Sequence, residues 1–304
     1  ESGLPWIIEE SDDDMLPGVN PLEVTGDIVV AGSSTVFPMA EEVIARWYDE
    51  GYSNQYSTTY TSIGSGAGFE RFGNGESDIS GASRPIKESE VENARSIGLE
   101  PLEFNVATDA LAVVVNPVNT WATDMTIEEL ALAFSTADTW ADVRDGWPEV
   151  EIIRYSPGTD SGTFDYFVEE VFDEDEAPIL NAENIQFSED DNVLVQGVEG
   201  DDGAIGYFGF AYFVEESDRL SGVDVEGVTP NAETVDAGEY PLARPLFLYS
   251  DAGIMRDKPQ VAAFIAFFLT YAEEEAADVG YFPASPDKIR AAKQQWLDVM
   301  EGMY

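Results

Sequence analysis

The chain contains no cysteine and no histidine, and it has few basic residues. The absence of cysteine excludes disulfide bridges, cysteine-ligated zinc and thiol catalysis. The absence of histidine excludes a Ser-His-Asp triad and every histidine-ligated metal site. With 14 basic residues against 61 acidic ones, the formal net charge is -47. Nucleic acid is therefore not expected as a partner, because nothing would offset the repulsion between the chain and the phosphates.

A long hydrophobic run is also missing. The best apolar stretch, residues 261–272, is well short of the roughly 20 residues that a membrane-spanning helix needs, and it predicts a buried helix. Residues 1–10 lack the basic and apolar regions of a secretory signal. The chain is thus expected to be either cytoplasmic or a mature product from which a signal has been removed.

The composition is otherwise that of a folded protein. The hydrophobic fraction is 44% and the aromatic fraction 12% over 304 residues, which is enough to build a core and favours two domains. The acidic charge is spread along the chain, and ten arginines stand against four lysines. These features predict an acidic surface adapted to near-molar salt, in which charges are screened within about 3 Å. The alternative is an ordinary acidic protein from dilute surroundings.

Short apolar strands alternate with amphipathic helices along the chain, which predicts an α/β fold with helices on both faces of the sheets. Residues 126–129 fit a capping box that opens a helix. Residues 1–25 are predicted to form an extended acidic arm. The predicted strands are 27–32, 56–63, 78–83, 111–115, 151–155, 204–208 and 244–249. The other main predicted helices are 36–50, 87–97, 161–172, 190–197, 258–277 and 286–300.

One local pattern occurs three times: a strand, a turn of Gly, Ser and Thr, and then a helix. It covers residues 29–38, 61–72 and 155–167. The N-terminus of a helix has free backbone N–H groups and a partial positive charge, so each such turn is a candidate oxyanion site. The alternative is that the serines of these turns are simple helix caps. None of the three turns contains a Walker A sequence.

Arg84 is a further candidate, because it directly follows the predicted strand 78–83. A guanidinium fork matches a tetrahedral oxyanion through two parallel hydrogen bonds. The alternative is a surface ion pair with one of the many carboxylates.

Taken together, these segments resemble the substrate-binding protein of the ABC-type phosphate transporter, over about 270 residues that begin at Ile28. The segments that carry the resemblance include GSSTVFP (32–38), GSGAGF (64–69), SDISGASRPIK (77–87), ATDALAVVVNP (107–117) and PGTDSGTFDYF (157–167).

The resemblance implies a type II periplasmic-binding-protein fold with two lobes and two crossover strands. Each lobe is expected to be a doubly wound sheet flanked by helices. Lobe 1 is expected at 26–115 plus 246–304 and lobe 2 at 116–245, with the ligand held between them. Residues 1–25 would then be a tether.

Carried over by motif, the phosphate ligands of lobe 1 are expected to be Ser34, Thr35, Val36 and Ser65. Those of lobe 2 are expected to be Ser161, Gly162 and Thr163 at a helix N-terminus.

The sequence departs from the common family pattern at two positions. Many relatives have Asp directly after GAS, where this chain has Arg84, and many have Arg four residues before the Ser of SGT, where this chain has Pro157. The positive partner is therefore expected to be Arg84, in lobe 1. Phosphate near neutral pH keeps a proton that sulfate lacks, so a selective site needs an acceptor for that proton. Asp160 is predicted to be this acceptor, and the alternative is a helix-capping carboxylate. Weaker candidates for the acceptor are Asp78, Asp109 and Asp191.

The function implied by the resemblance is that of an extracellular phosphate receptor, which is not an enzyme and has no cofactor or metal. We expect a monomer that delivers phosphate to the transmembrane subunits of an ABC permease. The chain would be a secreted lipoprotein, anchored through a cysteine upstream of residue 1. The main alternative is the same fold binding sulfate or arsenate, and a remote one is a Ser-dependent hydrolase that uses Lys87. A calcium-binding role for residues 173–176 is disfavoured, because this run lacks the ligand spacing and the glycine of an EF-hand, and a solvated acidic face is expected instead.

Overall fold

The structure is a computed structural model that describes residues 4–8, 10–20, 23–52 and 56–301, and it divides into two compact units. Unit 1 is Glu1–Thr108 with Pro245–Tyr304, and unit 2 is Asp109–Arg244. The chain enters unit 2 within β6 (Pro101–Val115) and leaves it within β13 (Ala243–Asp251). Residues 109–115, which were assigned to lobe 1 from the sequence, fall in unit 2.

The sheet of unit 1 has the strand order β4-β3-β5-β13-β6. The strands β3 (Ile28–Gly32), β4 (Thr58–Ser62) and β5 (Ile79–Ala82) are parallel, and β13 pairs with β5 in the antiparallel sense. A short strand, β14 (Phe282–Pro283), pairs with β6. Because β3, β4 and β5 run in the same direction, the turns that follow them lie at one edge of the sheet.

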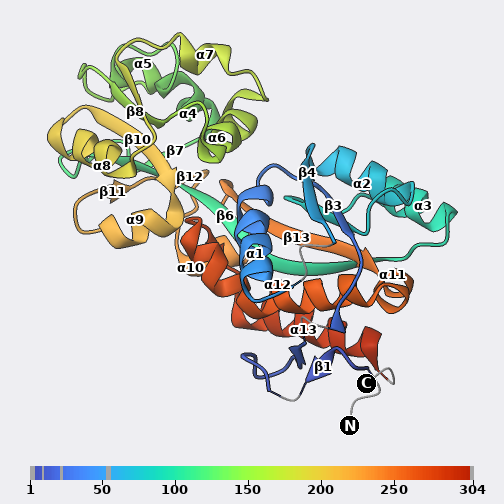
Figure 1. Cartoon of the computed structure of the whole chain (residues 1–304). Coiled ribbons are helices and arrows are strands. Elements are labelled where there is room, and N and C mark those ends of the chain that lie inside the picture. The colour runs from blue at the N-terminus through green and yellow to red at the C-terminus, as the bar shows by residue number, and fades with distance from the viewer. Residues whose placement is uncertain (1–3, 9, 21–22, 53–55, 302–304) are drawn as a thin grey trace. The chain divides into compact units, whose positions relative to one another are not determined.

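Helices cover both faces of this sheet, as the α/β reading predicts. The two faces follow from the alternation along β13: Leu246 and Leu248 belong to the large core of α1 and α12, whereas Phe247 and Tyr249 pack with Phe69 of α2 (Figure 1). The helices of this unit are α1 (Phe37–Asp49), α2 (Ser65–Gly73), α3 (Glu88–Ser96), α11 (Ala252–Asp257), α12 (Pro259–Asp278) and α13 (Pro286–Met300).

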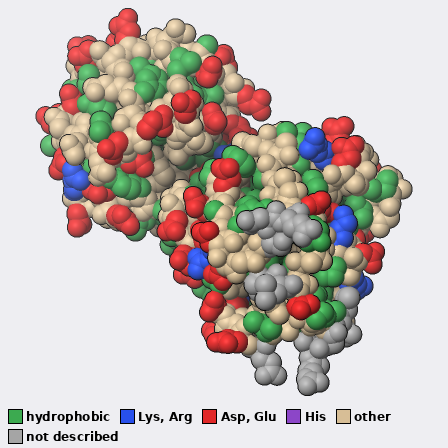
Figure 2. All heavy atoms as spheres, viewed as in Figure 1, with side chains coloured by type: hydrophobic (Ala, Val, Ile, Leu, Met, Phe, Trp, Pro, Cys, Tyr) green, Lys and Arg blue, Asp and Glu red, His purple; other side chains and the backbone are tan. Residues whose placement is uncertain are grey.

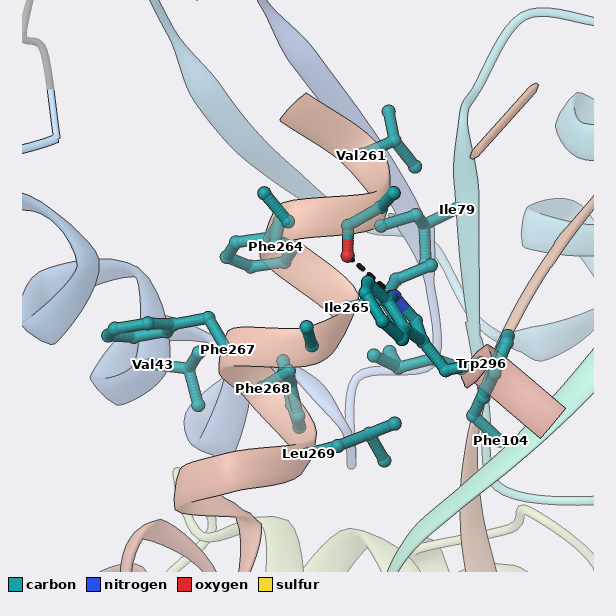
Figure 3. Close-up of a cluster of buried hydrophobic side chains, with 14 of the residues drawn as sticks. Val43, Ile79, Phe104, Val261, Phe264, Ile265, Phe267, Phe268, Leu269 and Trp296 are labelled. Atoms are coloured by element: carbon teal, nitrogen blue, oxygen red, sulfur yellow. Dashed lines mark hydrogen bonds between the residues drawn. The ribbon is translucent and has the colours of Figure 1, made fainter. Parts of the chain in front are cut away.

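Helix α12 forms the centre of the core of unit 1. Every side chain from Val261 to Leu269 is buried, which confirms the buried helix predicted from this apolar stretch. Trp296 of α13 lies against α12, and its indole Nε1–H donates to the carbonyl of Ala262 at 2.8 Å (Figure 3). Each such large apolar side chain contributes about 1.5–3 kcal/mol when it is fully buried.

The described part of the N-terminal segment is packed onto unit 1, so the prediction of an extended arm over residues 1–25 was wrong for this part. Its strands β1 (Ile7–Ile8) and β2 (Gly18–Val19) form an antiparallel pair. Trp6 and Leu16 are each 2% exposed, and Trp6 packs edge-to-face on Trp296 with ring centroids 6.3 Å apart. The acidic residues dominated the sequence pattern, but the apolar residues between them supply enough burial to fix the segment.

The sheet of unit 2 has the strand order β6-β10-β8-β9. Strand β10 (Ala204–Gly209) is antiparallel to β6 and parallel to β8 (Ile153–Pro157), and β8 is parallel to β9 (Ile185–Ser188). A short strand, β11 (Ser221–Gly222), also pairs with β6, and β7 (Asp124–Met125) pairs with β12 (Asp224–Val225) in a separate sheet. The turns after β8 and β9 therefore lie at one edge of this sheet.

The predicted capping box of unit 2 is confirmed. The Thr126 hydroxyl accepts from the Glu129 N–H at 3.1 Å, and the Glu129 carboxylate accepts from the Thr126 N–H at 2.9 Å. Together they open α4. The helices of unit 2 are α4 (Ile127–Ala133), α5 (Trp140–Val143), α6 (Gly162–Phe172), α7 (Ala177–Leu180), α8 (Asp191–Gly200), α9 (Phe210–Glu216) and α10 (Ala232–Asp236).

The surface is strongly acidic. Figure 2 shows carboxylates distributed over the visible face of each unit, with only a few basic side chains among them. Among the described residues, no helix combines the length and the apolar character that a membrane crossing requires.

Candidate functional site

Three turns of unit 1 are joined by backbone hydrogen bonds at the carboxyl edge of its sheet. The Ser33 N–H donates to the carbonyl of Gly81 at 2.9 Å, and the Gly64 N–H donates to that of Gly32 at 2.9 Å. A Cβ built on Gly68 of α2 would lie 2.5 Å from the Cα of Gly32. The N-terminus of α2 thus approaches β3 at backbone distance, and the turns after β3, β4 and β5 form one cluster.

The first of these turns presents backbone groups and one exposed hydroxyl. Ser34 is exposed. Thr35 is 7% exposed; its N–H donates to the Ser33 hydroxyl at 3.1 Å and its carbonyl accepts from the Tyr281 hydroxyl at 2.8 Å. Val36 is completely buried and is the N-cap residue of α1. Val36 can therefore reach a ligand only through its backbone amide.

The second turn places Ser65 at the start of α2, beside a serine that the sequence analysis did not select. The Ser65 hydroxyl accepts from the Ser83 N–H at 3.0 Å, and the two hydroxyl oxygens are 3.2 Å apart. Ser83 directly precedes Arg84 in the turn after β5. Two hydroxyls and the first amides of α2 are thereby brought together.

Arg84 lies beside the same helix end. A Cβ built on Gly66 of α2 would be 3.8 Å from its Nη2 atom. The guanidinium makes a two-point ion pair with Glu90, with Nη1 at 2.9 Å and Nη2 at 2.7 Å from the carboxylate oxygens. The hydrogen bonds to Glu90 raise the pKa of Arg84. Burial acts to raise the pKa of Glu90, but the hydrogen bonds from Arg84 and from the Lys87 N–H outweigh it and the pKa is lowered. Both groups are therefore charged, and the ion pair proposed as an alternative role for Arg84 is present.

In unit 2 the corresponding feature is the N-terminus of α6. Ser161 is its N-cap residue, and the Ser161 hydroxyl accepts from the Thr163 N–H at 3.2 Å. A Cβ built on Gly162 would meet no atom within 4 Å, so the place that a side chain would take at this position is open. The Gly162 amide and the hydroxyls of Ser161 and Thr163 are the groups that can reach a ligand.

Asp160 is exposed and directly precedes this cap. Because Ser161 supplies the cap, the alternative that Asp160 caps the helix was wrong. A second carboxylate, which the sequence analysis did not select, lies close by: a Cβ built on Gly158 would be 1.6 Å from Oε1 of Glu189. Asp191, at the first position of α8, follows the neighbouring strand, and burial together with nearby carboxylates raises its pKa. The carboxyl edge of this sheet therefore combines helix amides with several acidic groups.

Two of the weaker acceptor candidates have structural partners. Asp78 is 5% exposed and directly precedes β5; its carboxylate accepts from the Val29 N–H at 3.0 Å and pairs with Lys258 at 2.5 Å. It lies at the edge of the sheet opposite to the cluster of turns. Asp109 is buried against Arg244 with an Nε–Oδ2 distance of 3.3 Å. Burial raises the pKa of Asp109, and Arg244 opposes this effect.

The structure therefore brings together Ser34, Thr35, Val36, Ser65 and Arg84 in unit 1, and Asp160, Ser161, Gly162 and Thr163 in unit 2. Ser83 and Glu90 were missed, although Glu90 stands three residues after Lys87 and thus has the spacing of a capping box. Each set offers backbone amides, hydroxyls and, in unit 1, one guanidinium. Such donor sets bind an oxyanion without catalytic chemistry.

Known proteins similar to this chain include binding proteins for phosphate. A family model for the PBP superfamily domain matches residues 20–271. The chain is 38% identical to protein SphX of Synechocystis sp. over 283 residues, or 90% of this chain and 83% of SphX. It is 36% identical to the phosphate-binding protein PstS of Staphylococcus haemolyticus over 272 residues, or 88% of this chain and 83% of that protein.

Solved structures agree with the fold. A possible phosphate binding protein from Planctomyces limnophilus superposes with a TM-score of 0.83 at 37% identity, over 91% of this chain and 100% of that chain. An ABC-type phosphate transport receptor from Vibrio cholerae superposes with a TM-score of 0.64 at 22% identity, over 84% and 99% of the two chains, and shares the fold.

Proposed function

Since the chain belongs to the PBP superfamily, we propose that it is a receptor that binds inorganic phosphate and delivers it to the permease of an ABC transporter. It is a binding protein and not an enzyme. Relatives named for phosphate binding support this function. The observation that carries it is the meeting of Ser65, Ser83 and Arg84 at the N-terminus of α2. In a chain with a net charge of -47, such a concentration of donors is suited to an anion.

Phosphate binding would use short-range donors. The first amides of a helix have no partner in the helical hydrogen-bond ladder, so those at the starts of α1, α2 and α6 are candidate donors. The exceptions are Pro38, which has no N–H, and Thr163, whose N–H donates to the Ser161 hydroxyl. Hydroxyls of Ser34, Ser65, Ser161 and Thr163 add donors, and Arg84 adds positive charge. We expect the donor set of each unit to offer hydrogen bonds of this kind to phosphate, and the family resemblance is the basis for this expectation.

Selectivity for phosphate over sulfate would come from a proton acceptor. Phosphate carries at least one proton near neutral pH and can donate it to a carboxylate, whereas sulfate can only be repelled. Asp160, exposed beside the cap of α6, is the proposed acceptor. Such a receptor would act on the outer side of the cytoplasmic membrane as a monomer, and a lipid anchor is the proposed form of attachment.

The proposed function is tested by calorimetric titration of the purified chain with phosphate in near-molar salt. We expect one phosphate per chain and weaker binding of sulfate and arsenate in competition. Arg84→Gln should weaken phosphate binding about 100-fold, since hydrogen bonds to charged groups contribute about 1.5–3 kcal/mol. The matched control is Arg95→Gln, because Arg95 is 56% exposed and pairs with Glu100; its affinity should equal that of the original chain.

The same titration applied to Asp160→Asn tests the acceptor. The ratio of phosphate to sulfate affinity should fall, because the amide still permits sulfate to bind and no longer repels it. An unchanged ratio would show that Asp160 is not the acceptor, and Glu189→Gln and Asp191→Asn would then be the next variants. Absence of phosphate binding in the original chain would reject the function itself.

A further inference from the structure

The carboxylate of Glu90 holds the far end of the Arg84 side chain. Both Nη atoms of the guanidinium donate to Glu90, at 2.9 and 2.7 Å, and Nη1 also donates to the carbonyl of Pro85 at 3.1 Å. The guanidinium carbon lies 5.2 Å from the ring centroid of Phe69. The side chains of Arg84 and Glu90 are 31% and 18% exposed. Because the ion pair has two hydrogen bonds and is partly buried, it fixes the orientation of the guanidinium plane as well as its distance from Glu90.

Glu90 is itself fixed by the backbone. It is the third residue of α3, and its Oε2 atom accepts from the Lys87 N–H at 2.8 Å in a capping arrangement. The first turn of α3 therefore determines where the carboxylate lies, and the carboxylate determines where the guanidinium lies. The backbone of Arg84 is restricted as well, because Pro85 follows it directly.

One edge of the guanidinium has N–H groups without a hydrogen-bond partner among the described residues. Of its five N–H groups, two on Nη1 and one on Nη2 are used by Glu90 and Pro85. The Nε–H and the second Nη2–H have no partner within the described part of the chain, and these two groups are parallel. A Cβ on Gly66 would lie 3.8 Å from Nη2, so this edge is close to the N-terminus of α2. The carboxylate of Glu90 lies at the end of the guanidinium formed by Nη1 and Nη2.

From this geometry we propose that Glu90 is a positioning residue for anion binding. By occupying the outer end of the Arg84 guanidinium, it presents the Nε/Nη2 edge to an oxyanion at the N-terminus of α2. This inference rests on the proposed phosphate function. The negative charge of Glu90 weakens the long-range attraction of Arg84 for an anion. At hydrogen-bond distance this loss is outweighed, because the Nε and Nη2 donors are already held in the orientation that binds the anion.

The test compares phosphate affinity, measured by calorimetry in near-molar salt, for the original chain and for Glu90→Gln, Arg84→Gln and the double variant. Removing a partner that orients a ligating side chain typically weakens binding 10–100-fold, as known for metal sites, so Glu90→Gln should weaken phosphate binding by about tenfold. In the Arg84→Gln background the same change should have less than about a twofold effect. Glu88→Gln is the control, because Glu88 is an exposed carboxylate in the same turn of α3 and should leave the affinity unchanged.

A second measurement needs no phosphate. In ¹⁵N spectra the Nη signals of Arg84, assigned by their loss in Arg84→Gln, should be separate in the original chain and averaged by rotation in Glu90→Gln. Averaged signals in the original chain would overturn the positioning role.

The outcomes separate the two proposals. Phosphate binding by the original chain with an affinity of Glu90→Gln that is unchanged, or tighter, would overturn the role of Glu90 and leave the proposed function standing. An equal loss in both the original and the Arg84→Gln backgrounds would also overturn it, because Glu90 would then act through the stability of α3. Absence of phosphate binding in the original chain would reject the proposed function, and with it the role given to Glu90.

Discussion

At the scale of single residues, several of the few cations of this chain are fixed by hydrogen bonds. Arg84 is held by Glu90, and Arg144 is held by Glu129 through two contacts of 2.6 and 2.5 Å. Buried Arg154 instead donates to the backbone carbonyls of Ala133 and Glu183. With four acidic residues or more available to each basic one, an ion pair can be formed almost anywhere. What distinguishes Arg84 is the donor edge that remains beside a helix N-terminus.

The capping box of α4 gives a prediction for pH dependence. Hydrogen bonds from Arg144 lower the pKa of Glu129 below its ordinary value. The folded state therefore favours the ionised carboxylate, and this stabilisation is present above the ordinary pKa and is lost as the pH falls through the lowered value. Glu129→Gln should reduce the free energy of unfolding by about 1–2 kcal/mol at pH 7, from the weakened cap and the lost ion pair.

This difference should shrink towards zero as the pH falls below the lowered pKa, where the original side chain is also neutral. Denaturant unfolding of both forms at several pH values measures it. Glu128→Gln, an exposed neighbour in the first turn of α4, serves as control. A difference that stays constant down to acid pH would show that the charge of Glu129 does not stabilise the fold.

At the scale of elements, the site of unit 1 depends on how closely α2 approaches β3. Gly68 permits this approach, because a Cβ there would lie 2.5 Å from the Cα of Gly32 and 2.9 Å from the carbonyl oxygen of Ala31. Both obstacles are backbone atoms, which cannot rotate away. The position of the α2 N-terminus, and hence of Ser65, is therefore set by the lack of a side chain at residue 68.

Gly68→Ala should destabilise the chain by about 1–3 kcal/mol, the usual cost of overpacking, although alanine favours a helix over glycine by up to about 1 kcal/mol. Phosphate binding should weaken as well, because α2 must move away from β3. Thermal unfolding and calorimetric titration measure the two effects. Gly200→Ala is the matched control, since a Cβ there would meet no atom within 4 Å. If Gly68→Ala and Gly200→Ala had equal stability and equal phosphate affinity, the added methyl group at residue 68 would be accommodated without moving the N-terminus of α2.

At the scale of the whole molecule, the net charge of -47 opposes the proposed ligand. In near-molar salt the repulsion is screened within about 3 Å, so capture depends on local donors alone. The halophilic reading, which remains a proposal, makes the acidic surface and an anionic ligand compatible. In dilute salt the repulsion extends over tens of ångströms and acts on both the ligand and the fold.

Lowering the salt from about 1 M to about 0.01 M should slow phosphate association by about tenfold or more, the reverse of electrostatic steering. It should also lower the free energy of unfolding through self-repulsion. Stopped-flow binding and circular dichroism, recorded on the same samples, separate the two effects. Affinity that rises as the salt falls, with the fold intact, would contradict the proposal.

The sequence by itself determined the class of fold and most of its elements. The helix at 286–300 and the cap at Thr126 agree with the structure, because hydrophobic periodicity and capping chemistry act over a few neighbouring residues. The motif order was sufficient to indicate the family. By contrast, strand β6 extends over Pro101–Val115, although only 111–115 carry an apolar run, because its pairing partners are distant in the chain.

Only the tertiary structure decided which polar groups meet. The hydrogen bond between Ser83 and Ser65 and the hold of Glu90 on Arg84 join different turns and helices. The packing of Trp6 on Trp296 joins the two ends of the chain. No local pattern encodes such contacts, since the residues involved are ordinary serines, carboxylates and tryptophans until the sheet brings their turns to one edge. The sequence predicts donors, and the fold determines which of them are occupied and which remain for a ligand.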